Sequence, residues 1–237
     1  MHDRAHAAIL PGNQEAMMRH FDEIFQIGAD RKGGAAALEE ALTKPLSAAK
    51  LAAIPEDRWL SIMTKCIFQA GFNWQVIENK WDGFEVAFDG FDVGRCAFMD
   101  DEKFDALLTD KSIVRNGMKI ATVRENAAFL LELRDEGGAG AVLGGWPSTD
   151  YIGLLDMLKK RGSRIGGSTG QYAMRFAGRD SFILSRDVTA RLMAEGVIDK
   201  PATSKTAMKA VQGAFNTWME QSGRSLTEIS RVLAMSV

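Results

Sequence analysis

The sequence predicts an all-α protein, because almost every segment has helical periodicity and no convincing run of alternating β-branched residues competes with it. The chain has 237 residues, enough to bury the core of one large domain or of two small ones. Its 46% hydrophobic and 25% charged residues are typical of a soluble globular protein. This composition excludes a disordered or collagen-like chain.

Apolar residues recur every three or four positions along most of the chain, which places them on one face of a helix. Met17, Phe21 and Ile24 form one such stripe, and Trp59 and Met63 belong to the next. The same spacing is found in segments spread over the whole chain, and each is predicted to be a helix. They are residues 15–27, 59–67, 100–108, 121–133, 150–160, 187–193 and 206–219.

Clusters of glycine and proline separate these segments and predict turns between the helices. The glycine-rich stretch 137–145, followed by Pro147, indicates a flexible connector. It could be a hinge between two helical lobes or a single surface loop. Further along, Ser225 and Glu228 have the spacing of a capping box, which predicts the start of the last helix.

The overall charge gives little reason to expect a polyanionic partner. Lys and Arg number 29 against 31 Asp and Glu, so the formal charge is -2 and nucleic-acid binding would need a local site. No apolar run approaches the ~20 residues that span a bilayer, and the N-terminus is too polar for a signal peptide. The sequence therefore predicts a cytoplasmic protein with no membrane partner.

One segment is a local exception, because it combines clustered cations with glycines. Four cations fall within the six positions 159–164, and a glycine-rich stretch follows them. We expect a helix to end at Arg161, Gly162 to take a left-handed turn, and a second helix to begin near Ser168. The first backbone N–H groups of that helix would suit a phosphate, although such a turn can also be only a turn. The predicted phosphate-binding residues are Lys160, Arg164, Gly166, Gly167, Ser168 and Thr169.

This hairpin and several other stretches resemble, in the same order, the 3-methyladenine DNA glycosylase I family of the helix-hairpin-helix DNA glycosylase superfamily. The stretch Phe68-Gln-Ala-Gly-Phe-Asn-Trp74 is similar to the family's Gln-Ala-Gly-x-x-Trp signature. The other matching stretches are Phe88-Asp-Gly-Phe-Asp92, Val114-Arg-Asn-Gly-Met-Lys-Ile120 and Leu158-Lys-Lys-Arg-Gly162 through Tyr172. The resemblance covers roughly residues 59–176. It implies a glycosylase fold of two helical lobes around a cleft, with a hairpin that grips the DNA backbone without reading bases.

The sequence departs from the family at two places. The family has a glutamate three residues before the signature glutamine, where it contacts the methylated base, and Cys66 stands at that position here. The family's zinc site of terminal cysteines and histidines has no counterpart either. The only residues of these types are Cys66, Cys96, His2, His6 and His20, so we expect no structural zinc and no cofactor.

Asp187 is the candidate catalytic residue. In the broader superfamily an aspartate follows the hairpin at about this distance and serves catalysis, and Leu184-Ser-Arg-Asp187 resembles that motif. A carboxylate can stabilise the oxocarbenium-like sugar that forms when a base is lost. Asp187 could equally be only the N-cap of the following helix. No lysine stands where the bifunctional enzymes form a Schiff base, so a monofunctional enzyme is expected.

The residues expected to form the base pocket lie mainly in the signature stretch, because an extruded base is held by stacking between aromatic rings. They are Cys66, Gln69, Phe72, Trp74 and Tyr172. Phe72 could equally belong to the core, and Cys66 could be a small buried apolar residue. Glu78, one helical turn after Trp74, could replace the missing glutamate, but a solvent-exposed position is favoured.

The sequence thus predicts a monofunctional DNA glycosylase that acts on duplex DNA containing an alkylated, 3-methyladenine-like base. We expect an N-terminal helical extension over residues 1–53, a glycosylase-like core over 54–200 with the hairpin at 161–168, and C-terminal helices over 201–237. The alternatives are a DNA-binding relative that kept the hairpin and lost the chemistry, or a helical interaction protein with no nucleic-acid partner. Cys66 favours the non-catalytic relative and Asp187 opposes it.

Overall fold

The computed structural model describes residues 18–237 and confirms the all-α prediction, since this part of the chain contains helices and no strand. The predicted residues His2, His6 and Met17 lie outside the described part. The α-helices are α1 (Phe21–Lys32), α2 (Ala35–Glu40), α3 (Ala48–Ala52), α4 (Glu56–Gln69), α5 (Trp74–Asn79), α6 (Trp81–Ala87), α7 (Val93–Ala97), α8 (Asp101–Thr109), α9 (Gly117–Glu132), α10 (Tyr151–Arg161), α11 (Gly167–Phe176), α12 (Arg186–Ala194), α13 (Lys205–Ser222) and α14 (Leu226–Met235).

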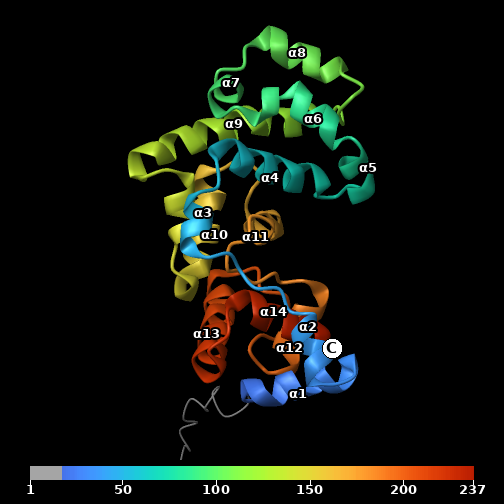
Figure 1. Ribbon diagram of the computed structural model, residues 1–237, viewed down its shortest axis with the longest axis vertical. Coiled ribbons are helices and arrows are strands. Elements are labelled where there is room, and N and C mark those ends of the chain that lie inside the picture. The colour runs from blue at the N-terminus through green and yellow to red at the C-terminus, as the bar shows by residue number, and fades with distance from the viewer. Residues whose placement is uncertain (1–17) are drawn as a thin grey trace, which may run out of the picture.

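The helices form two groups along the long axis of the molecule (Figure 1). Helices α4 to α9 lie at one end, and α1, α2, α12, α13 and α14 lie at the other. Helices α3, α10 and α11 lie between them. The segment of residues 18–40 thus packs beside the C-terminal helices, with α1 in contact with α13 and α14. Among residues 18–237, no helix is long and apolar enough to cross a bilayer.

Helix α4 connects the group formed by α4 to α9 to the helices in the middle of the molecule. Acidic Glu56 and Asp57 in its first turn suit the positive end of the helix dipole. The side chains of Trp59, Met63 and Ile67 are fully or almost fully buried, as their spacing predicts. The helix packs against α9 and α11, and its C-terminal end is therefore held close to the hairpin.

The predicted hairpin is present, but its turn differs from the prediction. Gly162 is extended (φ -91°, ψ 162°), and the left-handed conformations belong to Arg164 (φ 53°) and Gly167 (φ 59°). A Cβ at position 162 would lie 2.4 Å from Cγ2 of Ile165 and 2.9 Å from the carbonyl oxygen of Leu158. Glycine is therefore needed here for a close approach between segments and not for the handedness of the turn.

The turn is fixed from outside by a buried asparagine of α9. The Asn126 side chain donates to the carbonyl oxygen of Ser163 (3.0 Å) and accepts from its backbone N–H (2.8 Å). Because Asn126 is fully buried, these two bonds hold the turn at one position relative to α9.

We expect Asn126→Ala to lower the free energy of unfolding by about 2 kcal/mol, since it removes two hydrogen bonds and leaves backbone groups of Ser163 without partners. Urea denaturation measures this loss. Asn79→Ala is the matched control, because Asn79 is exposed and such surface substitutions change stability by about 0.5 kcal/mol or less. Equal losses in the two variants would contradict the role given to Asn126.

The glycine-rich stretch 137–145 is a packed part of the fold, so the prediction of a flexible connector is wrong. Residues Gly140–Gly144 form a π-helical turn that packs on α3, with Leu143 fully buried. A Cβ on Gly140 would lie 2.7 Å from the carbonyl oxygen of Ala52. The glycines therefore serve close backbone packing, which composition alone does not distinguish from flexibility.

Candidate functional site

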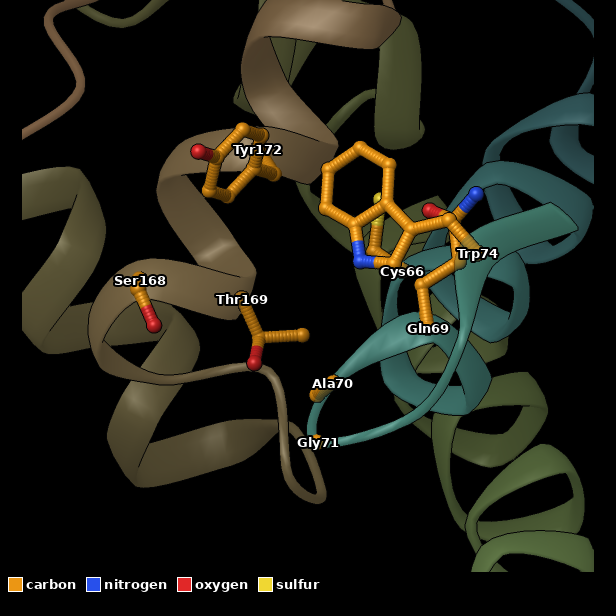
Figure 2. Close-up of a pocket in the computed structure, with 8 residues that line it drawn as sticks. All are labelled: Cys66, Gln69, Ala70, Gly71, Trp74, Ser168, Thr169 and Tyr172. Carbon is orange, nitrogen blue, oxygen red and sulfur yellow. The ribbon is translucent and has the colours of Figure 1, made fainter. Parts of the chain in front are cut away.

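A cavity of about 200 Å³ lies between the C-terminal end of α4 and the first turns of α11. Figure 2 shows the loop after α4 facing the start of α11 across this cavity. Two segments that are about one hundred residues apart in the chain thus form opposite walls. The lining residues are Cys66, Gln69, Ala70, Gly71, Trp74, Ser168, Thr169 and Tyr172. We call this cavity the α4–α11 pocket.

One wall of the α4–α11 pocket is aromatic. Trp74 begins α5, whose N-cap Asn73 accepts a hydrogen bond from the backbone N–H of Gln75 (2.9 Å). The Trp74 ring lies edge-on to Tyr172 and Phe176 of α11, with centroids 5.3 and 6.1 Å apart. Since Trp74 is 42% exposed, its ring is accessible and can stack on a planar group.

Gln69 is the buried amide of the pocket. Its Nε2 donates to Oε1 of Glu78 (3.0 Å), and Nζ of Lys65 forms an ion pair with Oε2 of Glu78 (2.6 Å). A carboxylate only accepts hydrogen bonds, so Glu78 fixes which end of the Gln69 amide is turned toward it. The Oε1 atom of Gln69 is buried and has no hydrogen-bond partner among the described residues.

Cys66 lines the pocket in the last turns of α4. Burial raises the pKa of its thiol to about 12, which keeps the group protonated at neutral pH. A protonated thiol is a weak nucleophile, and the side chain therefore acts as a small uncharged part of the wall.

The loop that follows α4 is held by Lys119 of α9. Its Nζ donates to the carbonyl oxygens of Phe68 (3.1 Å) and Ala70 (2.8 Å) at the C-terminal end of α4. A cation at this end suits the helix dipole. Burial and the nearby Arg164 lower the pKa of Lys119. Lys119 was not among the site residues predicted from the sequence, although it lies within the matched stretch 114–120.

The cations of the hairpin differ in their partners. Lys160 pairs with Asp156 of its own helix (2.6 Å), and Arg161 pairs with Glu136 (2.7 Å). Within residues 18–237, Lys159 and Arg164 form no ion pair, and both are exposed. The Nη2 atom of Arg164 donates to Sδ of Met118 (3.4 Å). Lys159 and Arg164 are therefore the cations of the hairpin that are available to a ligand.

The first turn of α11 has no side-chain cap. Its N-cap Gly166 makes no side-chain capping bond, so the first N–H groups of the helix keep their capacity to donate. Ser168 and Thr169, which were predicted to bind phosphate, line the α4–α11 pocket, whereas Gly166 and Gly167 do not. The start of α11 thus joins the hairpin to the pocket.

The predicted base-pocket residue Phe72 and the candidate catalytic residue Asp187 lie outside the pocket lining. Phe72 is 46% exposed, which excludes the core position considered for it, and it does not line the pocket. Asp187 is exposed at the second position of α12, and Ser185 is the N-cap, accepting from the backbone N–H of Val188 (3.2 Å). The segment before α12 is tied to α11, because the backbone N–H of Leu184 donates to Oε1 of Gln171 (2.8 Å).

No group of three or more His, Cys, Asp or Glu side chains within residues 18–237 is arranged to hold a metal ion. Cys66 and Cys96 are separate buried thiols, and the Sγ of Cys96 contacts the carbonyl oxygen of Phe88 (3.4 Å).

Comparison with known proteins gives one family match and several similar structures. Residues 55–142 match the model of a family described as methyladenine glycosylase. A solved structure of 3-methyladenine DNA glycosylase I has 23% identity and a TM-score of 0.45, over 61% of this chain and 87% of that one. A variant solved with 3-methyladenine has 18% identity and a TM-score of 0.47, over 64% and 89%. The enzyme from Staphylococcus aureus has 21% identity and a TM-score of 0.45, over 64% and 88%.

Proposed function

We propose, from the match of residues 55–142 to the methyladenine glycosylase family, that this chain is a divergent member of that family and a monofunctional DNA glycosylase. The observation that carries the proposal is the α4–α11 pocket, which has an accessible tryptophan on one wall and lies at the start of the hairpin's second helix. Its proposed substrate is an alkylated, 3-methyladenine-like base in duplex DNA.

In the proposed reaction the damaged nucleotide leaves the base stack and its base enters the α4–α11 pocket. Trp74 stacks on the base, and Tyr172 closes the same wall. The bond between the sugar C1′ and the base nitrogen breaks, and its electron pair leaves with the base. A water oxygen then bonds to C1′, a proton is released, and an abasic site remains.

The proposed carboxylate for this step is Asp187, which would stabilise positive charge on the sugar and position the water. When a base is held in a pocket, the sugar attached to it stays outside. A carboxylate that faces the sugar therefore need not line the pocket. The hydrogen bond between Leu184 and Gln171 supports this placement, since it anchors the start of α12 to the helix that lines the pocket.

DNA binding is assigned to the hairpin and the start of α11. Backbone N–H groups of residues 166–169 and the free cations Lys159 and Arg164 would contact phosphates, which position a protein without specifying a sequence. Lys160 contributes less, because Asp156 already neutralises it.

We expect Arg164→Gln to weaken DNA binding more than Lys160→Gln does, although each removes one positive charge. Each lost phosphate contact makes the slope of log affinity against log salt about 0.9 less steep. We therefore expect that change for Arg164→Gln and a smaller one for Lys160→Gln, measured by fluorescence anisotropy with an undamaged duplex. Unchanged affinity and slope in both variants would show that the hairpin is not the anchor.

The function itself is tested by incubating the protein with methylated duplex DNA and separating released bases by chromatography. Release of an alkylated base without strand cleavage is the expected result. DNA binding without release of any alkylated, deaminated or oxidised base would favour the second candidate, a non-catalytic DNA-binding protein. The observation that favours this candidate is the uncharged Cys66 at the family's glutamate position. Absence of both binding and release would leave a helical interaction protein.

A further inference from the structure

Trp74, the residue proposed to stack on the base, is not held by the core of the protein. It begins α5, a helix of six residues, and its side chain lies outside the hydrophobic core cluster. An indole that is 42% exposed can adopt other rotamers unless neighbouring side chains prevent it. The orientation of this ring therefore depends on contacts outside the core.

Two aromatic rings of α11 make such contacts. Tyr172 and Phe176 are four residues apart, which places them on the same face of α11. The indole of Trp74 is nearly perpendicular to both rings, at 85° and 83°, with the centroids 5.3 and 6.1 Å away. These are the distances and angles of edge-to-face pairs, which favour particular ring orientations. Two such contacts, one helical turn apart, restrict the tilt of the indole more than one contact does.

The two rings of α11 differ in what else they contact. Tyr172 lines the α4–α11 pocket and packs against the core. Phe176, the last residue of α11, is 50% exposed, lies outside the core cluster and does not line the pocket. Its ring pairs with Trp74 and, at 5.8 Å, with Tyr172. Neither core packing nor contact with a base in the pocket therefore accounts for a phenylalanine at this position.

We infer that Phe176 is a positioning residue, which holds the indole of Trp74 in the orientation that stacks on the extruded base. The inference rests on the proposed function and adds to it a residue that does not touch the base. Stacking requires the indole and the base to lie parallel, so a ring that is already oriented loses less freedom when the base enters. One aromatic pair corresponds to a factor of about 2 to 12 in a rate or an equilibrium.

Two substitutions at Phe176 separate the ring from its apolar bulk. Phe176→Leu keeps an apolar side chain without a ring, and Phe176→Tyr keeps the ring. We expect Phe176→Leu to lower the single-turnover rate of base release from methylated duplex DNA about fivefold, and Phe176→Tyr to stay within about twofold of the wild-type rate. Affinity for undamaged duplex should be unchanged in both variants.

The control for these rates is Phe98→Leu, since Phe98 is 83% exposed at the end of α7. Equal rates for Phe176→Leu and Phe98→Leu would overturn the inference. A weaker affinity of Phe176→Leu for undamaged duplex would also overturn it, because Phe176 would then contact the DNA itself.

A double variant tests whether Phe176 acts through Trp74. If it does, Phe176→Leu has no further effect on base release in a chain that already carries Trp74→Ala, because the ring that it positions is gone. A loss in that chain as large as the loss in the wild-type chain would show two independent effects and contradict the inference.

Fluorine NMR measures the orientation of Trp74 without any catalysis. The chain has five tryptophans, so labelling with 5-fluorotryptophan gives five resonances, and Trp74→Phe identifies the one that belongs to Trp74. We expect Phe176→Leu to shift or broaden this resonance, and Phe176→Tyr to keep it near the wild-type position. The other four resonances report whether the variants fold.

A Trp74 resonance with the same position and width in Phe176→Leu as in the wild-type chain would overturn the inference. If the wild-type chain releases no base, the proposed function fails, and the NMR comparison alone decides whether Phe176 holds the indole. If the wild-type chain releases base and Phe176→Leu releases it equally fast, the proposed function stands and the inference fails.

Discussion

Asp187→Asn is expected to lower the rate of base release about 100-fold, while DNA binding and folding are kept. Asparagine has the shape of aspartate but no negative charge. The variant therefore loses one preorganised group that stabilises the positive charge developing on the sugar. Single-turnover base release, DNA affinity and the melting temperature measure the three properties separately.

The control for this variant is Asp101→Asn. Asp101 also lies in the first turn of a helix, α8; its side chain is almost fully exposed, and its surface ion pair with Arg124 (3.7 Å) contributes little to stability. Each substitution removes a favourable interaction with the helix dipole of about 0.3–1 kcal/mol, so the two variants should lose similar stability. An Asp187→Asn enzyme as active as Asp101→Asn would remove Asp187 from the mechanism. A loss of activity that only follows a lower melting temperature would do the same.

Trp74→Ala is expected to lower base release by about 5- to 150-fold, since stacking of one base on an aromatic side chain contributes about 1–3 kcal/mol. Trp74→Phe keeps a ring and should retain more of the activity. The loss should appear in the release of the damaged base and not in affinity for undamaged duplex, which the hairpin provides. Chromatography of released bases and anisotropy with undamaged DNA measure the two effects.

Phe98→Ala is the control for the removal of an exposed ring. Phe98 is 83% exposed at the end of α7, and it does not line the α4–α11 pocket. Its removal should leave base release unchanged. If Trp74→Ala releases base as fast as Phe98→Ala does, the pocket does not hold the base.

The helices themselves could be predicted from the sequence, because their determinants are local. The apolar stripe of Trp59, Met63 and Ile67 needs only the 3.6-residue period, and it became α4. The capping box of Ser225 and Glu228 needs only four residues, and both of its hydrogen bonds are present at the start of α14. The expected helix at 15–27 shifted to α1 (Phe21–Lys32), since a stripe does not fix where a helix ends.

Part of the candidate site could also be predicted. Cys66, Gln69, Trp74 and Tyr172 were all expected around one pocket, and they line it together with Ser168 and Thr169. The order of the matched stretches supplied this expectation. Periodicity within each helix could not supply it, because α4 and α11 are far apart in the sequence and periodicity does not indicate which helices pack together.

Only the tertiary structure decided which groups are free to act. Lys159, Lys160, Arg161 and Arg164 look equivalent in the sequence, but carboxylates neutralise the middle two. Lys119 was not selected from the sequence, and its hydrogen bonds to Phe68 and Ala70 cross about fifty residues of chain. Propensity and periodicity act over one or two helical turns. The partner of a charge or of a hydrogen-bonding group is set by which distant segments pack together, and that packing exists only in the folded chain.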